Sequence, residues 1–193
     1  MLIVCVELCS IHLQQSSDDE HLLANSLFGD GAAATVITSG GYGRAELELE
    51  KFHNALSTDG KAEMGWYVGD FGFEMRLSHN VPNVIQSGIK KLTDQLLQTL
   101  DLTISEVQYY AIHPGGKKIL QVIEEALDIG KDDNRDAHEI LRRAGNMSSP
   151  TVLFVLQGLM NRIKEVAQSG ERVLSFAFGP GLTLESMLLR IAL

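Results

Sequence analysis

The chain has 193 residues, 45% of them hydrophobic and 21% charged, which are the proportions of a globular domain large enough for a real core. Its net charge of −9 argues against a nucleic-acid partner, which would need clustered lysine and arginine. Binding of an anionic substrate would need a local patch of basic side chains, because the negative net charge of the chain does not attract anions.

The N-terminal apolar stretch has no basic residues before it and is too short for a membrane span. It contains the only two cysteines, Cys5 and Cys9, which cannot form a disulfide framework for a chain of this size. A reducing compartment, and hence a cytoplasmic location, is expected. Neither the cysteines nor any pair of histidines has useful zinc-site spacing, so no metal site is predicted.

The first quarter of the chain predicts strands and one helix, separated by turns. The expected elements are a buried strand at 2–9, a helix at 21–28, a small-residue strand at 32–38, a turn at 40–43 and a half-exposed strand at 45–53 near a sheet edge. Glycines at 29 and 31 permit close backbone approaches after the helix. Because the chain starts inside an apolar strand, we expect that a segment normally precedes Met1.

The remainder alternates between helical and strand patterns. The expected elements are an irregular stretch with short strands at 54–72, helices at 81–100, 116–127, 136–144 and 149–167, and strands at 107–112, 172–178 and 182–192. Pro82 suits a first helical turn, and Gly145 is a helix stop. With no repeat or linker, the pattern predicts one α/β domain, in which helices pack on a mixed five-stranded sheet.

His113 is the first candidate for a functional side chain. It ends a predicted buried strand and precedes Pro114, Gly115 and Gly116, where a helix begins. In open α/β sheets, functional side chains commonly lie at such strand ends. The free backbone N–H groups at the start of a helix also favour binding of an anion or an oxyanion. A buried histidine bonded to a carbonyl is the alternative for this position.

Asn146 is the second candidate, in the stretch Gly145-Asn146-Met147-Ser148-Ser149. It could cap the next helix, although Ser148 could do so equally well and leave Asn146 free. We expect the His113 and Asn146 turns to meet in one polar site. His138 lies among charged residues and is interpreted as a solvated helix residue.

Four motifs in order resemble the C-terminal half of type III polyketide synthases, the chalcone synthase-like enzymes. They are Leu27-Phe28-Gly29-Asp30-Gly31-Ala32-Ala33-Ala34, Ile112-His113-Pro114-Gly115-Gly116, Gly145-Asn146-Met147-Ser148-Ser149 and Phe178-Gly179-Pro180-Gly181-Leu182-Thr183-Leu184-Glu185. The resemblance extends over nearly all of residues 1–193, taken as one C-terminal domain. It implies a thiolase-like fold, a homodimer, and acyl transfer from CoA thioesters without another cofactor.

In this family an acyl-CoA starter is loaded onto a cysteine and extended by decarboxylative Claisen condensation with malonyl-CoA, and the product then cyclises. The resemblance implies that His113 and Asn146 are two members of a Cys-His-Asn triad. Both imidazole nitrogens and the amide N–H₂ would donate to the developing oxyanion. Phe28 would contact the malonyl group and favour its decarboxylation. Further implied substrate-binding positions are Gly115, Gly116, Ser148, Gly179, Pro180 and Gly181.

Three positions depart from the plant pattern. Met75 stands where a second gatekeeper phenylalanine is usual, and Cys9 and His12 stand where two threonines shape the plant cavity. These changes disfavour flavonoid-type starters. A flexible methionine suits an aliphatic acyl chain, so the resemblance favours alkylpyrone or alkylresorcinol products.

The nucleophile is the largest departure, because in the family it lies upstream of the strand that opens this chain. Cys5 and Cys9 lie within that strand, without a helix N-terminus to lower a thiol pKa. We therefore expect the catalytic cysteine to be absent and the chain alone to be inactive. Two alternatives stay open: a ketoacyl-ACP synthase or thiolase-like domain, and a non-catalytic half-domain that acts by dimerisation.

Overall fold

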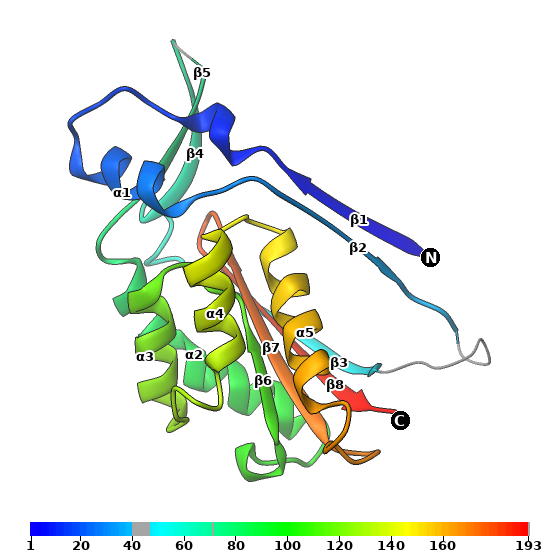
Figure 1. Ribbon diagram of the computed structural model, residues 1–193. Coiled ribbons are helices and arrows are strands. Elements are labelled where there is room, and N and C mark those ends of the chain that lie inside the picture. Colours follow the sequence, from blue (N-terminus) through cyan, green and yellow to red (C-terminus); the bar gives the residue numbers. More distant parts are fainter. Residues whose placement is uncertain (40–46, 71, 193) are drawn as a thin grey trace.

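The computed structural model describes residues 1–39, 47–70 and 72–192 (Figure 1). The turn expected at 40–43 and the first two residues of the strand expected at 45–53 lie outside these ranges. The strands are β1 (Leu2–Glu7), β2 (Gly31–Val36), β3 (Leu47–Leu56), β4 (Met64–Gly69), β5 (Gly72–Leu77), β6 (Tyr109–Ile112), β7 (Arg172–Gly179) and β8 (Thr183–Ile191). The helices are α1 (Asp19–Leu27), α2 (Val81–Gln98), α3 (Lys117–Leu127), α4 (Arg135–Ala144) and α5 (Pro150–Ile163).

A mixed sheet in the order β3-β8-β7-β6 forms the centre of the fold. β6 and β7 are parallel, and the other two pairings are antiparallel. The expectation of an edge strand after residue 45 is confirmed, since β3 ends the sheet. The expectation of five strands in one sheet is wrong for the described residues, because β1 pairs with β2 and β4 pairs with β5 in separate two-stranded sheets.

Helices cover both faces of this sheet (Figure 1). α2 lies against β3 and β8, while α4 and α5 lie against β6, and α3 contacts both α2 and α4. α2 has Pro82 in its first turn and buries Ile85, Ile89, Leu92 and Leu96, which recur every three or four residues and form one apolar face. We call the sheet with α2–α5 the layered body, because it contains nearly all of the buried core.

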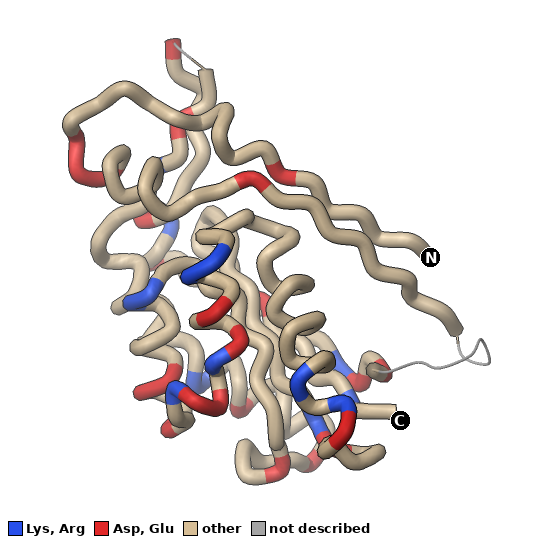
Figure 2. The backbone as a smooth tube through the Cα atoms, viewed as in Figure 1, with Lys and Arg blue, Asp and Glu red and all other residues tan. Residues whose placement is uncertain are grey.

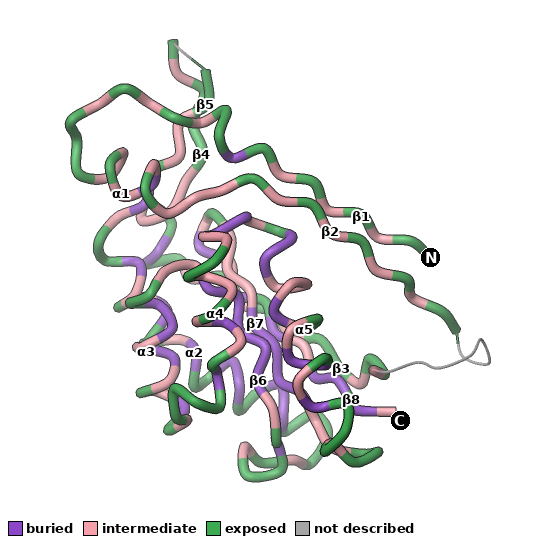
Figure 3. The backbone as a smooth tube through the Cα atoms, in the orientation of Figure 1, coloured by how far each residue is buried: buried purple, intermediate pink, exposed green. Residues whose placement is uncertain are grey.

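β1 and β2 form a long two-stranded ribbon that lies beyond α5, and we call it the N-terminal ribbon (Figure 1). The prediction that its first strand is buried is wrong, because side chains alternate between half-buried and exposed (Figure 3). The inner face lies toward α5. The outer face consists of Leu2, Val4, Val6, Ala32, Ala34 and Val36, all exposed. No described segment covers that face.

Most charged residues lie in the layered body, on its helices, strands and connecting loops (Figure 2). The N-terminal ribbon carries a single charged residue, Glu7, on its inner face. His138 is corrected from a solvated to a half-buried residue, because its Nε2 lies 2.7 Å from Glu124 Oε1, which also accepts from Asn134 Nδ2 at 2.9 Å. These bonds join α3 to α4.

The β4–β5 hairpin stands at one end of the molecule beside α1 (Figure 1). The irregular stretch expected at 54–72 therefore contains one full strand of this hairpin. Across the hairpin Met64 pairs with Leu77 and Trp66 pairs with Met75. Among the described residues no helix is long and apolar enough to cross a membrane, and no group of three or more metal-binding side chains is found.

Candidate active site

His113 follows the last residue of β6, at the end of the layered body that faces the hairpin. Its backbone N–H donates to Phe176 O of β7 at 2.9 Å, which holds the residue at the carboxyl end of two parallel strands. The side chain is 7% exposed, and burial lowers the pKa of the imidazole to about 4. At neutral pH the ring is therefore neutral and donates from one nitrogen only. Donation from both nitrogens, which the family resemblance implies, would need a nearby anion to restore the second proton.

The turn after His113 is held tightly against α3. Gly116 precedes the helix, which begins at Lys117. A Cβ atom on Gly115 would lie 2.9 Å from Ile119 Cδ1, so a larger residue would force that side chain to move. The carbonyl of Gly115 is left free to accept from the second candidate residue.

Asn146 follows the C-terminal end of α4, two residues beyond Ala144. The residue is 5% exposed. Its Nδ2 lies 3.5 Å from Gly115 O, and its Oδ1 accepts from the backbone N–H of Ser148 at 2.8 Å. Because Oδ1 is bonded in this way, the N–H₂ group is the one directed at Gly115 O, in the turn that follows His113. The alternative of a helix cap is not what the structure shows, since α5 begins at Pro150 without a side-chain cap.

A one-residue bridge joins Phe28 to Asn146. The backbone N–H of Asn146 donates to Leu27 O at 2.9 Å, and the N–H of Gly29 donates to Asn146 O at 3.0 Å. Two glycines make this approach possible: a Cβ on Gly29 would lie 2.8 Å from Ala144 O, and one on Gly145 would lie 2.7 Å from Leu27 O. Two motifs that are 118 residues apart in sequence, from 28 to 146, thus form one rigid unit.

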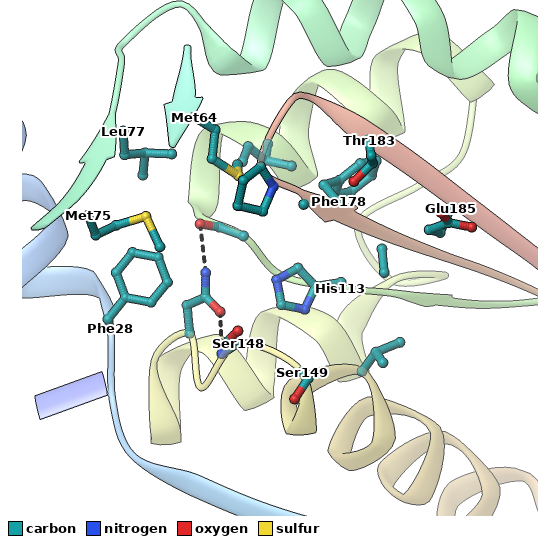
Figure 4. A pocket seen from close by; sticks show the side chains of 17 residues that line it. Phe28, Met64, Met75, Leu77, His113, Ser148, Ser149, Phe178, Thr183 and Glu185 are labelled. Carbon is teal, nitrogen blue, oxygen red and sulfur yellow. Dashed lines mark hydrogen bonds between the residues drawn. The ribbon is translucent and has the colours of Figure 1, made fainter. Parts of the chain in front are cut away.

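A cavity of about 270 Å³ opens in front of His113 and Asn146 (Figure 4). Eight of the sequence-predicted residues line it: Phe28, Met75, His113, Gly115, Asn146, Ser148, Gly179 and Pro180. Gly116 and Gly181 lie next to lining residues but do not line it themselves. The mostly apolar wall with a few donors suits a thioester, which has one polar carbonyl on an apolar chain.

Sequence reasoning missed several lining residues, among them Met64, Leu77, Ile119, Ser149, Val152 and Thr183. Met64 and Leu77 were missed because they face the cavity as a cross-strand pair, in a stretch that showed no clear periodicity. Thr183 and Glu185 could have been found, since both lie in the fourth motif directly after Gly181.

Cys9 and His12 line a second, smaller cavity of about 80 Å³. Phe28, Met75 and Ser148 line both cavities, which are therefore neighbours. Burial, followed by the charges of Glu7 and Asp30, raises the pKa of the Cys9 thiol, so it stays protonated at neutral pH. Neither Cys9 nor Cys5 lines the cavity of His113, and a protonated thiol is a weak nucleophile.

Comparison with known proteins agrees with this geometry. The family model for the C-terminal domain of chalcone and stilbene synthases matches residues 50–192. The chain is 35% identical to the alpha-pyrone synthesis polyketide synthase-like Pks18 of Mycobacterium tuberculosis, over 98% of this chain and 49% of that protein. It is 30% identical to a putative chalcone synthase of Bacillus subtilis, over 97% of this chain and 53% of that protein.

Solved structures show the same fold. The model superposes on PKS-I of the brown alga Ectocarpus siliculosus with a TM-score of 0.88 at 26% identity, covering 99% of this chain and 52% of that one. It superposes on the C-terminal type III polyketide synthase domain of Steely1, a type I/III hybrid from Dictyostelium, with a TM-score of 0.87 at 31% identity, covering 100% of this chain and 54% of that one.

The chain spans about half the length of the curated relatives it matches. The family match includes His113, Asn146 and the Gly179-Pro180-Gly181 turn, and leaves the N-terminal ribbon and Phe28 outside it. The structure has the thiolase-like fold of its structural neighbours, with helices packed on a mixed sheet. The chain therefore belongs to the chalcone and stilbene synthase family and corresponds to the C-terminal part of a type III polyketide synthase.

Proposed function

We propose that this chain supplies the His-Asn half of a type III polyketide synthase active site. The activity is acyl transfer: an acyl-CoA starter is condensed with malonyl-CoA by decarboxylative Claisen condensation, and the product cyclises. The observation that carries the proposal is that two buried polar side chains, His113 and Asn146, line one mostly apolar cavity. In the absence of a thiolate beside His113, burial keeps the imidazole neutral at neutral pH, and both side chains can donate a hydrogen bond to a thioester oxygen without carrying a charge.

The chemistry follows from these donors. Loss of CO₂ from a malonyl thioester leaves an electron pair on the α-carbon, which the carbonyl accepts as an enolate oxyanion. His113 and Asn146 donate to that oxygen. The enolate carbon then attacks the carbonyl carbon of the acyl group held on a cysteine, a C–C bond forms, and the C–S bond breaks to return the thiolate. A thiolate beside His113 would raise the pKa of the imidazole and keep the second nitrogen protonated.

Phe28 and Met75 are proposed to act on the malonyl carboxylate. Both line the cavity beside the donors, and an apolar wall there disfavours the carboxylate more than the neutral CO₂ it becomes. The apolar and flexible Met75 also suits an aliphatic starter. The name of the Mycobacterium relative mentions alpha-pyrone synthesis, which supports a pyrone product here.

The catalytic cysteine is proposed to come from the part of the relatives that this chain does not match. Two observations support this: neither cysteine of the chain lines the His113 cavity, and no segment that the structure describes covers the apolar outer face of the N-terminal ribbon. A homodimer and a cytoplasmic location belong to the proposal as well. The two free cysteines, Cys5 and Cys9, fit a reducing compartment.

The test uses the 193-residue chain and a fusion in which the unmatched part of the Mycobacterium relative precedes Met1. Each protein is supplied with malonyl-CoA and a fatty acyl-CoA, and released CO₂ and products are measured by radiolabel and mass spectrometry. We expect turnover from the fusion only. His113→Ala and Asn146→Ala should each lower kcat about 100-fold or more, whereas the exposed His79→Ala should not. Turnover by the chain alone, or an active His113→Ala fusion, would refute the proposal.

A further inference from the structure

The backbone around Asn146 is hydrogen-bonded on every side, and one of the partners is a buried side chain of α5. The N–H of Asn146 donates to Leu27 O at 2.9 Å, and its C=O accepts from the N–H of Gly29 at 3.0 Å. The next backbone N–H, that of Met147, donates to Thr151 Oγ1 at 2.9 Å. Thr151 is the second residue of α5 and is fully buried.

The peptide between Asn146 and Met147 is therefore held at both of its polar ends. A peptide is planar, so its C=O and N–H turn together as one rigid group. Gly29, which lies between Phe28 and β2, bonds the C=O, and Thr151 of α5 bonds the N–H. With the N–H of Asn146 bonded as well, these contacts fix the direction in which the Asn146 side chain leaves the backbone.

The side chain of Asn146 depends on the same turn. Its Oδ1 accepts from the N–H of Ser148 at 2.8 Å, which makes an Asx turn and leaves the N–H₂ group as the donor. Ser148 has a φ of 59°, in the left-handed region that is costly for residues other than glycine. Such a backbone persists only where its neighbours hold it. Here the N–H of Thr151 donates to Ser148 O at 3.1 Å.

Thr151 acts on this turn without facing the cavity. Ser148, Ser149 and Val152 line the cavity in front of Asn146, and Thr151 does not. Its hydroxyl oxygen is instead the partner of a buried N–H, since Met147 is 3% exposed. If the hydroxyl were removed, this N–H would lose its partner without reaching bulk water, so the peptide would be expected to turn away from its present orientation.

We propose that Thr151 is a positioning residue: its hydroxyl holds the peptide between Asn146 and Met147, and through this peptide it holds the amide N–H₂ of Asn146. The inference rests on the proposed function where it concerns turnover, because it takes Asn146 to donate to a thioester oxygen. Loss of the hydroxyl should move the donor and leave the lining of the cavity in place. It should therefore lower kcat more than it changes KM.

The first test is NMR spectroscopy of the 193-residue chain, which needs no substrate. In the wild type the amide of Met147 should exchange slowly with solvent, because it is bonded and buried. Thr151→Val keeps the branched shape and removes the acceptor. In this variant the side-chain amide signal of Asn146, identified by its absence from Asn146→Ala, should move by several line widths. The order parameter of the Ser148 N–H should fall from about 0.85 to below about 0.6.

Thr151→Ser and Thr93→Val are the controls. Serine keeps the hydroxyl, so the Asn146 signal and the Ser148 order parameter should return to their wild-type values. Thr93 is also buried, and its hydroxyl donates to Ile89 O within α2. Thr93→Val makes the same chemical change and should leave the Asn146 signal where it is. Circular dichroism and urea denaturation show that each variant is folded and how much stability it has lost.

The second test is turnover by the fusion protein with the same substitutions. Thr151→Val should lower kcat about 10-fold to 100-fold and change KM by less than about twofold, because a displaced donor loses contact with the transition state. Thr151→Ser and Thr93→Val should keep kcat within about twofold of the wild type. A purely structural role would lower the amount of folded protein and leave kcat per folded molecule unchanged.

Four results would overturn the inference: an unmoved Asn146 signal in Thr151→Val, an equal shift in Thr93→Val, no recovery in Thr151→Ser, or fast exchange of the Met147 amide in the wild type. The last of these needs no variant, so the inference stays testable even if Thr151→Val does not fold.

Failure of the proposed function is recognised separately. If the fusion shows no turnover while the Asn146 signal moves in Thr151→Val and returns in Thr151→Ser, the enzymatic proposal is wrong and the positioning by Thr151 stands. If the fusion turns over and Thr151→Val keeps the wild-type kcat, only the assignment of Thr151 is wrong.

Discussion

The layered body and the N-terminal ribbon are built from similar apolar strands but bury them to very different extents. In β7, residues Val173 to Phe176 are all buried, because β6 and β8 pair with both edges and helices cover both faces. In β1 exposed and half-buried residues alternate, because among the described residues only β2 pairs with it and only one face lies toward a helix. Burial is thus a property of the neighbours that a strand has.

The residues of the candidate site come from both of these regions. His113 and Asn146 are held by the layered body, whereas Phe28 lies at the junction of α1 and the N-terminal ribbon. The bridge between Phe28 and Asn146 is where the two regions meet. The region that holds His113 and Asn146 has helices on both faces of its sheet, whereas no described segment covers the outer face of the ribbon beside Phe28.

The largest expected effect contrasts a core residue with a ribbon residue. Phe176→Ala should lower the free energy of unfolding by about 3–5 kcal/mol, because Phe176 is fully buried and a cavity would remain. Val6→Ala should change it by less than about 0.5 kcal/mol, because Val6 is 62% exposed. Urea denaturation measures both. Similar losses from the two substitutions would show that the ribbon is covered in solution.

The second prediction concerns pH. Because burial lowers the pKa of His113 from about 6.5 to about 4, the unfolded chain binds a proton that the folded chain does not at pH values between these. Stability should therefore be lost as pH falls below about 6.5, by about 3 kcal/mol at pH 4 relative to pH 7.

His113→Gln should remove this part of the pH dependence, and His79→Gln, at an exposed position, should retain it. Denaturation of the three chains at about pH 7 and about pH 4.5 measures the difference. An identical pH dependence in wild type and His113→Gln would mean that the imidazole is not desolvated in the folded chain.

The third prediction tests the bridge between the two regions. Gly145→Ala should cost about 2 kcal/mol or more, because φ is 70° and a Cβ would lie 2.7 Å from Leu27 O. Gly170→Ala is the control: its φ is 96°, but nothing lies within 4 Å of its Cβ position. Amide hydrogen exchange should speed up at Gly29 and Asn146 in Gly145→Ala alone. Equal effects at both glycines would leave only backbone strain as the cause.

The smallest effect on stability, and the clearest on association, is expected from the ribbon face. The exposed Val4 and Val6 should make the isolated chain associate with itself, since contiguous apolar patches on a surface mark interfaces. Val4→Glu with Val6→Glu should reduce association and leave the unfolding free energy nearly unchanged. Light scattering over a range of concentrations measures this, and a clean wild-type monomer at high concentration would contradict it.

Much of the fold followed from local patterns. The periodicity of α2, Pro82 in its first turn and Gly145 after α4 placed those helices to within two residues, since caps and apolar spacing are local properties. The β4–β5 hairpin was not resolved, because its turn lies among scattered glycines and its apolar residues do not alternate regularly. The number of strands in the main sheet was wrong, because pairing depends on contacts between distant segments.

By itself the sequence determined the chemistry of the candidate site. His113 before Gly115, and Asn146 after Gly145, identified the candidate site residues and the family, because side-chain type and the freedom of glycine are properties of single residues. Only the tertiary structure decided that Phe28 and Asn146 share one bridge, that the imidazole is neutral, and that Cys9 and His12 lie in a separate cavity. Distance, desolvation and the shape of a cavity are set by packing between segments far apart in the chain.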